Sequence, residues 1–417
     1  MRVKAAAYAE WGSEDALREL LKDSSLPLPF LFVGAGSNLL FTGDFRGTVL
    51  HSAMKGIRIL PSCTFSAPSA SCESEPSGHE VFDFGEKGAA GCVSDSGSEV
   101  LAEVGSGVVF DDFCAWAAER DLWGVENLSH IPGEVGASAV QNVGAYGVEA
   151  KDVIVRVNCV ELSTGASVTF DNPECGYGYR ASNFKTVWKG LYAVTSVVFR
   201  LSSVPTPHLD YGHLRSAVEA AKSASSQPVS PQPVSPQPAS TQPATTAQLV
   251  STQADKAGCH SAGDASVSSK QWDNTLTPSL IREVVTEIRR QKLPEPSELG
   301  SAGSFFKNPV IPQEHFDRIL NDFRQSNGSE ATVPHYVVEQ PGDAAPMIKV
   351  PAAWLIEQCG WKGRQTGNVA CYSKQPLVIV NLTGNATPQE VIDLENSIIS
   401  SVRDRFGVTL SPEVEHI

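Results

Sequence analysis

The cysteines of this 417-residue sequence form no pattern that would bind a metal or build a disulfide framework. There are nine of them, an odd number, and no two stand in a CxxC pair. Zinc sites and thioredoxin-like redox motifs usually contain such pairs, so both kinds of site are disfavoured and we expect no metal. Reduced, mostly structural thiols are typical of a protein that works in a reducing cytosol.

A long apolar stretch is also missing. No segment approaches the roughly 20 apolar residues that a membrane helix needs. Residues 1–20, MRVKAAAYAEWGSEDALREL, lack the apolar core of a signal peptide. They lead instead into a helical pattern with Leu17, Leu20 and Leu21 on one side. We therefore expect a cytoplasmic protein without membrane insertion.

Positive charge is scarce as well. The formal net charge is −15, and an acidic surface repels nucleic acids and anionic membranes. We therefore expect no nucleic-acid partner, and the sequence points to no partner protein. An anionic ligand would have to be held by local donors, because the overall electric field opposes it.

Two segments contain too few apolar residues to form a core. Residues 61–98 are rich in Ser, Gly and Cys, and residues 221–270 contain SQPVSPQPVSPQPASTQPATT. Repeated X-Pro pairs favour an extended chain without packed structure. We interpret the first segment as a flexible surface insertion and the second as a disordered one. A partner-docking role for the Pro-rich tract is the alternative.

The remaining sequence is long enough for two or three domains, and its patterns predict an α+β fold. Strands and helices alternate irregularly through residues 28–51, 99–201 and 273–417. The strand-like runs are VIVRVNCVEL, LYAVTSVVFRL and PLVIVNL. The helical runs are FDDFCAWAAERD, SLIREVVTEIRRQKL, AAWLIEQCGW and TPQEVIDLENSIISSVRDRF.

Two glycine-rich stretches are candidates for backbone that contacts a ligand. The first, residues 34–38 (GAGSN), follows the apolar run LPFLFV, and a tight turn of this kind can aim N–H groups at phosphate oxygens. It does not match GxGxxG, so a plain turn is an open alternative. The second, residues 131–147, has too many small residues for a core strand. It fits a loop wrapped around a large flat cofactor, with an irregular structural loop as the alternative.

Three further residues could carry chemistry, although each also has an ordinary structural interpretation. Arg180 in CGYGYRASNFK offers a planar fork that suits a carboxylate. Ser304 in GSFFKNP stands between glycine and two aromatic residues. Glu413 lies in LSPEVEHI, near the end of the chain. No GxSxG elbow supports a serine hydrolase.

Taken together, these motifs resemble the UDP-N-acetylenolpyruvoylglucosamine reductase family. The matching pieces occur in the family's order and cover nearly all of the chain outside the two insertions. They are VGAGSNLLF, NLSHIPGEVGASAVQNVGAYGVE, CGYGYRASNFK, LDYGHL, QKLP, GSFFKNP, AAWLIEQCGWKG and LSPEVEHI. The LDYGHL piece is typical of the subtype that keeps a tyrosine loop near the substrate.

The resemblance implies an α+β fold with a two-segment FAD-binding module of the vanillyl-alcohol-oxidase type and a C-terminal α+β substrate-binding domain. The first FAD-binding segment would be shortened, because the chain starts inside a region where the family has an Asn-Thr-Phe segment. The implied divisions are 1–60 (first FAD-binding segment), 61–98 (insertion), 99–220 (second FAD-binding segment), 221–270 (insertion), 271–406 (substrate-binding domain) and 407–417 (a C-terminal segment that returns to the first FAD-binding segment).

The resemblance also implies site residues. Arg180 matches the catalytic arginine, Ser304 the proton donor and Glu413 the catalytic glutamate. The residues that match contacts to the nucleotide-sugar are Tyr179, Tyr211, Lys292, Asn308 and Gln375. Those that match the FAD site are Gly34, Ala35 (where the family has glycine), Gly36, Ser37, Asn38, Ile131, Pro132, Gly133, Gly136, Ala137, Ser138, Gln141, Asn142, Ala145, Tyr146 and Gly147.

The activity implied by the resemblance is the reduction of UDP-N-acetylglucosamine enolpyruvate to UDP-N-acetylmuramate, in peptidoglycan precursor synthesis. NADPH would reduce FAD and leave before the UDP-sugar binds. Two alternatives remain open from the residues alone. One is a related FAD-dependent oxidase, which would lack the GSFFKNP and PEV pieces. The other is a flavin- or nucleotide-sugar-binding protein without turnover.

Overall fold

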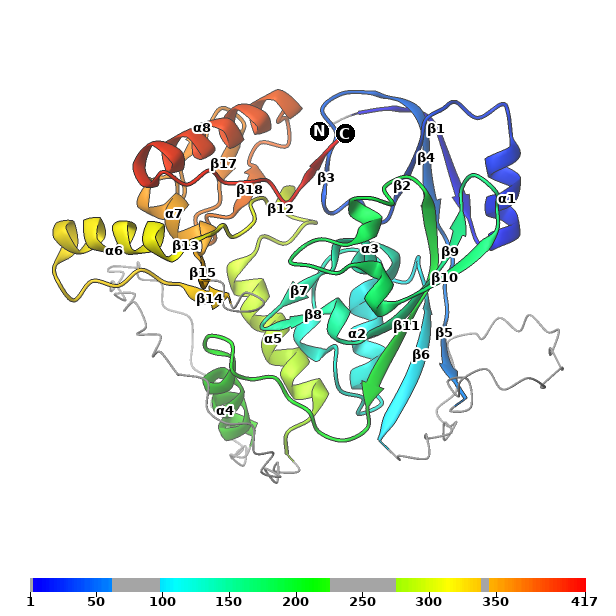
Figure 1. Cartoon of the computed structure of the whole chain (residues 1–417), viewed down its shortest axis with the longest axis horizontal. Helices are drawn as coiled ribbons and strands as arrows, with labels where there is room; N and C mark the ends of the chain where they lie inside the picture. Colours follow the sequence, from blue (N-terminus) through cyan, green and yellow to red (C-terminus); the bar gives the residue numbers. More distant parts are fainter. Residues whose placement is uncertain (1–2, 62–97, 226–274, 339–344) are drawn as a thin grey trace, which may run out of the picture.

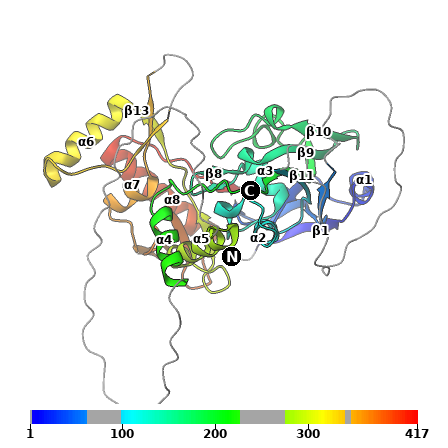
Figure 2. The same ribbon diagram turned by 90° about the horizontal axis from the view of Figure 1, so that it is seen from below.

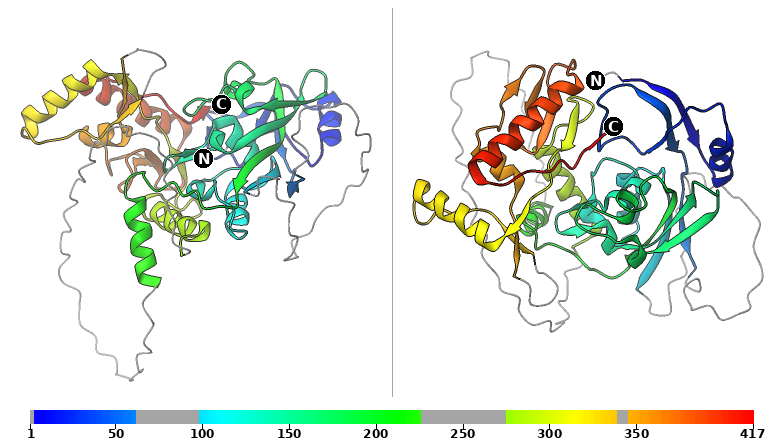
Figure 3. Two further views of the ribbon diagram at one scale, coloured as in Figure 1. Left: turned by 60° about the horizontal axis from the view of Figure 1, so that its bottom comes forward. Right: turned by 45° about the horizontal axis from the view of Figure 1, so that its top comes forward.

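The computed structural model describes residues 3–61, 98–225, 275–338 and 345–417 (Figure 1). Most of the two predicted insertions, residues 62–97 and 226–270, therefore lies outside the described residues. Figure 1 shows the sheets of the N-terminal half on one side and helices α6 (Gln313–Asn327), α7 (Ala352–Gln358) and α8 (Pro388–Phe406) on the other, with α5 (Pro278–Lys292) between them. Figures 2 and 3 show the same separation from other directions.

The first sheet is parallel and has the strand order β1-β4-β2. Its strands are β1 (Ala5–Trp11), β2 (Phe30–Val33) and β4 (Phe45–Ser52). Helix α1 (Glu14–Lys22) follows β1, and its first turn is stabilised because the Ser13 side chain accepts a hydrogen bond from the Ala16 N–H. Leu17 is buried, and Leu20 and Leu21 pack against the same cluster, so the predicted apolar face is confirmed.

The second sheet is antiparallel, with the order β10-β9-β11-β6-β5. Its strands are β5 (Ile57–Leu60), β6 (Glu99–Gly105), β9 (Ile154–Glu161), β10 (Ser167–Asp171) and β11 (Tyr192–Ser202). Helix α2 (Phe110–Ala118) packs on it, with the Phe113 ring 4.6 Å from that of Phe199. The two strand predictions and the helix prediction are thus confirmed.

Short elements connect the long strands of this second unit. They are η2 (Glu126–Leu128), α3 (Val135–Gln141), β7 (Gly144–Ala145), β8 (Val148–Glu149), η3 (Ala150–Asp152), η4 (Asn172–Cys175) and η5 (Asn183–Lys185). The glycine-rich stretch 131–147 is therefore not all loop, because α3 occupies its middle.

Helices α4 (Leu214–Ser225) and α5 (Pro278–Lys292) pack together over Trp123. Helix α5 starts at a favourable signal, since the Thr277 hydroxyl accepts the Leu280 N–H and Pro278 occupies the first turn. The predicted α5 helix is confirmed. The prediction of disorder was wrong for residues 221–225, because they continue α4.

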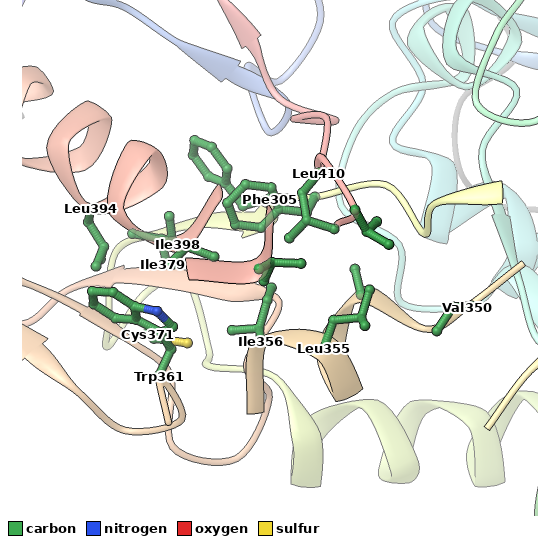
Figure 4. Packing of buried hydrophobic residues seen from close by; sticks show 14 of the residues in the cluster. Phe305, Val350, Leu355, Ile356, Trp361, Cys371, Ile379, Leu394, Ile398 and Leu410 are labelled. Carbon is green, nitrogen blue, oxygen red and sulfur yellow. The ribbon is translucent and has the colours of Figure 1, made fainter. Parts of the chain in front are cut away.

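The C-terminal unit contains a four-stranded sheet, β12-β18-β17-β16, and a three-stranded sheet, β13-β15-β14. Its helices pack on a single large apolar core, part of which is shown in Figure 4. The predicted helices α7 and α8 and the predicted strand β18 are confirmed. The elements are β12 (Ser301–Ser304), β13 (Val310–Pro312), α6 (Gln313–Asn327), β14 (Tyr336–Val338), β15 (Met347–Lys349), α7 (Ala352–Gln358), β16 (Gln365–Thr366), β17 (Val369–Cys371), β18 (Val378–Asn381) and α8 (Pro388–Phe406).

Helix α8 shows why its boundaries could be predicted. Thr387 and Glu390 form a reciprocal capping box at its start, and Gly407 with φ of 67° ends it. Within the described ranges, no helix is both long and apolar enough to cross a membrane.

The last residues of the chain connect the C-terminal unit to the first sheet region. Pro412 bridges Phe306, and strand β19 (Glu415–His416) pairs in parallel with β3 (Leu39–Leu40). Figure 1 shows this strand leaving the C-terminal unit and lying beside β3. Leu410 and Val414 are buried along the way. These contacts fix the position of the C-terminal segment between the two parts of the chain.

Candidate active site

Arg180 occupies an unusual turn. Gly178 and Ala181 exchange two backbone hydrogen bonds, of 3.0 and 3.1 Å, around it. Its φ is 54°, in the left-handed region that residues other than glycine rarely adopt. The turn directs the side chain inward, where it is 18% exposed. A strained conformation of this kind is more common at functional positions than elsewhere.

The guanidinium of Arg180 makes two hydrogen bonds and one ion pair within the protein. Nη1 donates to the carbonyl of Asn142 at 3.3 Å, and Nη2 donates to the carbonyl of Gly144 at 2.5 Å. Nε lies 3.0 Å from Oε1 of Glu413, whose side chain is 15% exposed. A guanidinium carries two hydrogens on each Nη, and each Nη uses one of them in these contacts, so among the described residues a second hydrogen on each has no acceptor.

Glu413 is the point where three segments of the chain meet. Its backbone N–H donates to the Phe305 carbonyl at 2.7 Å, and its own carbonyl accepts from Asn38 Nδ2 at 3.2 Å. Its carboxylate also accepts from Gln141 Nε2 at 3.3 Å. The side-chain Oε1 of Gln141 in turn accepts from Lys185 Nζ, and the pKa of Lys185 is lowered, chiefly by burial.

Ser304 ends strand β12 and is exposed. Within the described portion of the chain, its hydroxyl makes no hydrogen bond. The residue after it, Phe305, accepts the Glu413 N–H, and the residue before it, Gly303, lies close to the backbone of Ser37. The fold therefore brings Arg180 and Glu413 into direct contact. Ser304 lies next to Phe305, whose carbonyl accepts the Glu413 N–H.

The turn at residues 34–38 has free hydrogen-bond donors. Among the described residues, no acceptor meets the N–H groups of the four residues from Ala35 to Asn38. Gly36 has φ of 69°, whereas the φ of Ala35 is not positive, so its methyl group fits where the family has glycine. Ser37 Oγ donates to the Pro132 carbonyl at 3.2 Å, which joins this turn to the second glycine-rich stretch. Successive free N–H groups of this kind form a concavity suited to an anion.

The second glycine-rich stretch is shaped by close packing and by strained turns. A Cβ at Gly136 would lie 2.8 Å from the Cβ of Ser106, so only glycine fits there. Gly133 has φ of 128°, and the pair Tyr146 and Gly147 has φ of 48° and 83°. Because glycine has no side chain, the backbone at these glycines is open to close approach by a flat cofactor.

Two polar residues of this stretch use their side chains within the protein. The Ser138 hydroxyl donates to the Val135 carbonyl at 2.7 Å. The Asn142 amide donates to Glu149 and to the Gly178 carbonyl and accepts the Lys151 N–H. Any contact of these two residues with FAD remains a prediction.

Aromatic rings gather beside Arg180. The Tyr179 ring lies 4.5 Å from Lys349 Nζ, and burial raises the pKa of its hydroxyl. Tyr211 stacks on Tyr336 at 5.8 Å and meets the edge of Tyr146 at 6.2 Å. The residues predicted to contact the UDP-sugar through these rings thus border both the N-terminal and the C-terminal units.

Of the other predicted substrate residues, Asn308 adjoins this group, because its backbone makes a hydrogen bond with the Tyr179 hydroxyl. Asn308 Oδ1 accepts the Ala352 N–H at 2.9 Å, at the start of α7. Gln375 Oε1 faces the Leu377 N–H at 3.4 Å, and Leu377 pairs with Phe305. Lys292 ends α5 and is exposed, and among the described residues no contact joins it to Arg180 or Ser304.

The sequence did not reveal one buried ionic group beside the glycine-rich turn. Glu134 has a side chain only 7% exposed, and His51 Nε2 lies 3.0 Å from its carboxylate. A Cβ at Gly34 would be 3.2 Å from Glu134 Oε2, so this carboxylate packs under the turn. An acidic residue within a run of small apolar residues was the only signal that could have found it.

The fold and the site define an FAD-dependent oxidoreductase. The family profile described as FAD binding domain matches residues 79–171. The profile of the UDP-N-acetylenolpyruvoylglucosamine reductase C-terminal domain matches residues 295–417. The expected α+β fold, with an FAD-binding module and a C-terminal α+β domain, is confirmed.

The relatives identify the family. A UDP-N-acetylenolpyruvoylglucosamine reductase of Bacteroides fragilis (strain YCH46) is 35% identical over 415 residues, which cover 100% of this chain and 95% of that protein. Its counterpart in Porphyromonas gingivalis (strain ATCC 33277) is 36% identical over 387 residues, covering 92% and 85%. The chain belongs to the UDP-N-acetylenolpyruvoylglucosamine reductase family.

A solved structure agrees at the level of the fold. The crystal structure of UDP-N-acetylenolpyruvylglucosamine reductase (MurB) from Thermus caldophilus superimposes with a TM-score of 0.51, at 18% identity. The superposition covers 98% of this chain and 91% of that chain. The match at residues 295–417 leaves the oxidase alternative without support. The domain boundaries and the individual site residues stay predictions.

Proposed function

We propose that Arg180, Ser304 and Glu413 are the residues with which this chain carries out the reaction of its family. That reaction is the NADPH-dependent, FAD-mediated reduction of UDP-N-acetylglucosamine enolpyruvate to UDP-N-acetylmuramate, a step of peptidoglycan precursor synthesis. The observation that supports the proposal best is the Arg180 guanidinium, which is held by two hydrogen bonds and one ion pair and still has N–H donors without an acceptor among the described residues.

The residues of the two glycine-rich stretches fit FAD. The N–H groups of residues 35–38, for which no described residue provides an acceptor, suit the pyrophosphate, and the small residues of 131–147 leave room for a flat ring system. Held by these two stretches, FAD would supply the two-electron chemistry that connects oxidation of NADPH with reduction of the substrate double bond. The chain's own residues must then bind the substrate, stabilise the charge that develops and provide a proton.

Charge stabilisation is the task proposed for Arg180. The substrate is an enol ether conjugated to a carboxylate, so hydride addition moves negative charge onto that carboxylate. A preorganised donor group at this position lowers the barrier because it need not reorganise during the reaction. The planar fork of Arg180, with one free hydrogen on each Nη, matches the two oxygens of a carboxylate.

Glu413 is proposed to position Arg180. Its carboxylate is 3.0 Å from Nε, so it aligns the fork and balances some of its charge before the substrate arrives. Gln141 and the backbone contacts with Phe305 and Asn38 keep the carboxylate itself in place. The position of the C-terminal segment thereby determines the orientation of Arg180, which is proposed to bind the substrate carboxylate.

Ser304 is proposed to donate the proton. Hydride addition leaves an enolate, and the carbon next to the carboxylate must then take up a proton. A serine hydroxyl is a weak acid, so it suits a strongly basic enolate. Its exposure, and its lack of a hydrogen bond to any described residue, are compatible with a group that meets the substrate directly.

The remaining substrate contacts are proposed for the nucleotide-sugar. Tyr211 would cover it, Tyr179 would line it, and Lys292 would meet the diphosphate with a compact positive charge. Asn308 and Gln375 would contribute amide groups. We also propose that the enzyme acts in the cytoplasm, with no nucleic-acid partner, no membrane insertion and no partner protein, in keeping with its net charge of −15.

Two measurements test the proposal on the purified protein. Acid denaturation should release FAD, and consumption of NADPH beyond one equivalent per flavin should require the enolpyruvyl UDP-sugar, with UDP-N-acetylmuramate as the product by mass spectrometry. Release of FMN, or flavin that stays on the chain, would contradict the cofactor assignment. A yellow protein that binds the sugar without consuming NADPH would support a binding protein without turnover.

A further inference from the structure

Asn127 is a buried amide outside the residues discussed so far. It lies in η2, and the residue is 1% exposed. Its Nδ2 donates two hydrogen bonds, one to the Tyr146 carbonyl at 2.9 Å and one to the His208 carbonyl at 2.7 Å. Its Oδ1 has no partner among the residues that the structure describes. The side chain therefore acts on the backbone of two separate segments.

The first of these segments is the strained turn at the end of the glycine-rich stretch. Tyr146 has φ of 48°, a conformation that costs an ordinary residue roughly 1–2 kcal/mol. Gly147 follows with φ of 83°. A hydrogen bond to the Tyr146 carbonyl holds this turn in the conformation that the structure shows.

The second segment leads into Tyr211. His208 lies three residues before it, and the intervening Leu209 is buried in the same apolar cluster as Trp123, with Tyr146 packed against it. A Cβ at Gly147 would be 3.4 Å from the Cβ of Tyr211. The two segments that Asn127 joins therefore touch each other again at Tyr211.

From Tyr211 the contacts continue into the C-terminal unit. Its ring stacks on Tyr336 of β14 with an interplanar angle of 9°, and both rings are partly exposed, at 41% and 43%. Tyr211 is thus held by the N-terminal unit on one side and by the C-terminal unit on the other. Because the Tyr211 ring is partly exposed, its position depends on how firmly its backbone is held.

We propose that Asn127 is a positioning residue for substrate binding, because it fixes the Tyr211 segment against the Tyr146–Gly147 turn. This inference rests on the proposed role of Tyr211. A neutral amide is well suited to the task, since its NH₂ group can donate to two carbonyls at once. Aspartate would turn a carboxylate toward two carbonyl oxygens, and alanine would leave both without a donor.

The test compares holoenzyme variants in their affinity for UDP-N-acetylmuramate, measured by titration of the oxidised flavin spectrum. Two neutral hydrogen bonds hold the segment, so Asn127→Ala should weaken binding by roughly 10- to 30-fold. The rate of flavin reoxidation at saturating enolpyruvyl sugar, expressed per bound FAD, should change by less than about threefold, because neither hydrogen bond of the Asn127 side chain goes to Arg180, Ser304 or Glu413.

The matched control is Asn172→Ala. Asn172 also donates from Nδ2 to two backbone carbonyls, those of Lys151 at 2.8 Å and Ile154 at 2.7 Å, but it lies in η4. Its loss should lower the melting temperature and leave the affinity unchanged. If Asn172→Ala weakens binding as much as Asn127→Ala does, the effect is general destabilisation and the proposal is overturned.

A double-mutant cycle separates this inference from the role of Tyr211. If Asn127 acts through Tyr211, Asn127→Ala should add little to the loss caused by Tyr211→Ala. Fully additive losses, or normal affinity in Asn127→Ala while Tyr211→Ala binds weakly, would overturn the inference alone. Normal affinity in Tyr211→Ala would refute the proposed role of Tyr211 and the inference with it. Should Asn127→Ala not fold, Asn127→Ser, which keeps one donor, should show a smaller loss, and unchanged affinity would again overturn the proposal.

Discussion

The replacement of Asn142 offers a quantitative check on how Arg180 is held. Asn142 is fully buried and ends α3 in the left-handed conformation, with φ of 48°. Its side chain makes a charge-assisted hydrogen bond to Glu149 and two neutral ones, to the Gly178 carbonyl and from the Lys151 N–H. Together these are worth about 4 kcal/mol. Alanine adds about 1 kcal/mol because it tolerates the left-handed conformation poorly.

We therefore expect Asn142→Ala to lower the free energy of unfolding by about 5 kcal/mol, and Asn142→Gly by about 1 kcal/mol less, since glycine adopts this conformation freely. Urea unfolding of the holoenzyme, followed by circular dichroism, measures both values. Because Gly178 and the Asn142 carbonyl flank Arg180, turnover at a permissive temperature should also fall.

Asn158 provides the control for this prediction. It also makes three side-chain hydrogen bonds, one of them to the Glu103 carboxylate, but it lies within strand β9. Asn158→Ala should be destabilising without the additional cost of the left-handed conformation, and the surviving folded enzyme should turn over normally. A loss below about 1 kcal/mol in Asn142→Ala, or equal losses in its Ala and Gly variants, would refute the reasoning.

Three further predictions concern single residues. Arg180→Lys should slow flavin reoxidation by the enolpyruvyl sugar by about 10²-fold, because one ammonium cannot replace a fork held on three sides; stopped-flow rates close to those of the parent would contradict this. Gly136→Ala should cost about 1–3 kcal/mol, because its Cβ would lie 2.8 Å from that of Ser106; an unchanged urea midpoint would show that the helix shifts freely. Burial raises the pKa of Glu126 above its ordinary value of 4.5, so its ionisation opposes folding as the pH rises. Glu126→Gln should therefore be more stable than the parent at about pH 8, and the difference should vanish as the pH falls below about 4.5; a difference that grows toward acid pH would be the wrong sign.

Much of the secondary structure could be predicted because its signals are local. Helix α8 has its capping residues and its apolar spacing in one continuous stretch, and α1 shows a single buried face around Leu17. Helix α6 was not predicted, although Phe316, Ile319 and Phe323 repeat at helical spacing. That signal was present in the sequence.

Helix α3 is a different case. Four of its seven residues are Gly, Ala or Ser, and their propensities oppose one another, because alanine favours a helix whereas glycine disfavours it. Its helical form is fixed by packing against Ser106 and by the backbone hydrogen bonds of Val135 and Gly136, whose acceptors lie elsewhere in the chain. Tertiary contacts therefore decided this segment, and no local pattern contained them.

The residues of the site also fall into two groups, those that sequence motifs predicted and those that depend on tertiary contacts. Arg180, Ser304 and Glu413 were predicted from motifs, and the fold brings Arg180 and Glu413 to 3.0 Å. Groups such as Asn127, or the pair of His51 and Glu134, depend on contacts between segments far apart in sequence. Isolated polar residues of this kind carry no spacing that could identify them in advance.

The account depends most on the proton that Ser304 is proposed to donate. The most direct measurement is stopped-flow absorbance at the flavin band in Ser304→Ala, with reduction by NADPH and reoxidation by the enolpyruvyl sugar followed separately. Ser301→Ala, a change in the same strand, is the control. We predict unchanged reduction and a loss of about 10² or more in reoxidation for Ser304→Ala, the usual scale for a positioned general acid, and no change in either step for Ser301→Ala. Normal reoxidation in Ser304→Ala, or equal slowing of both steps, would contradict the account.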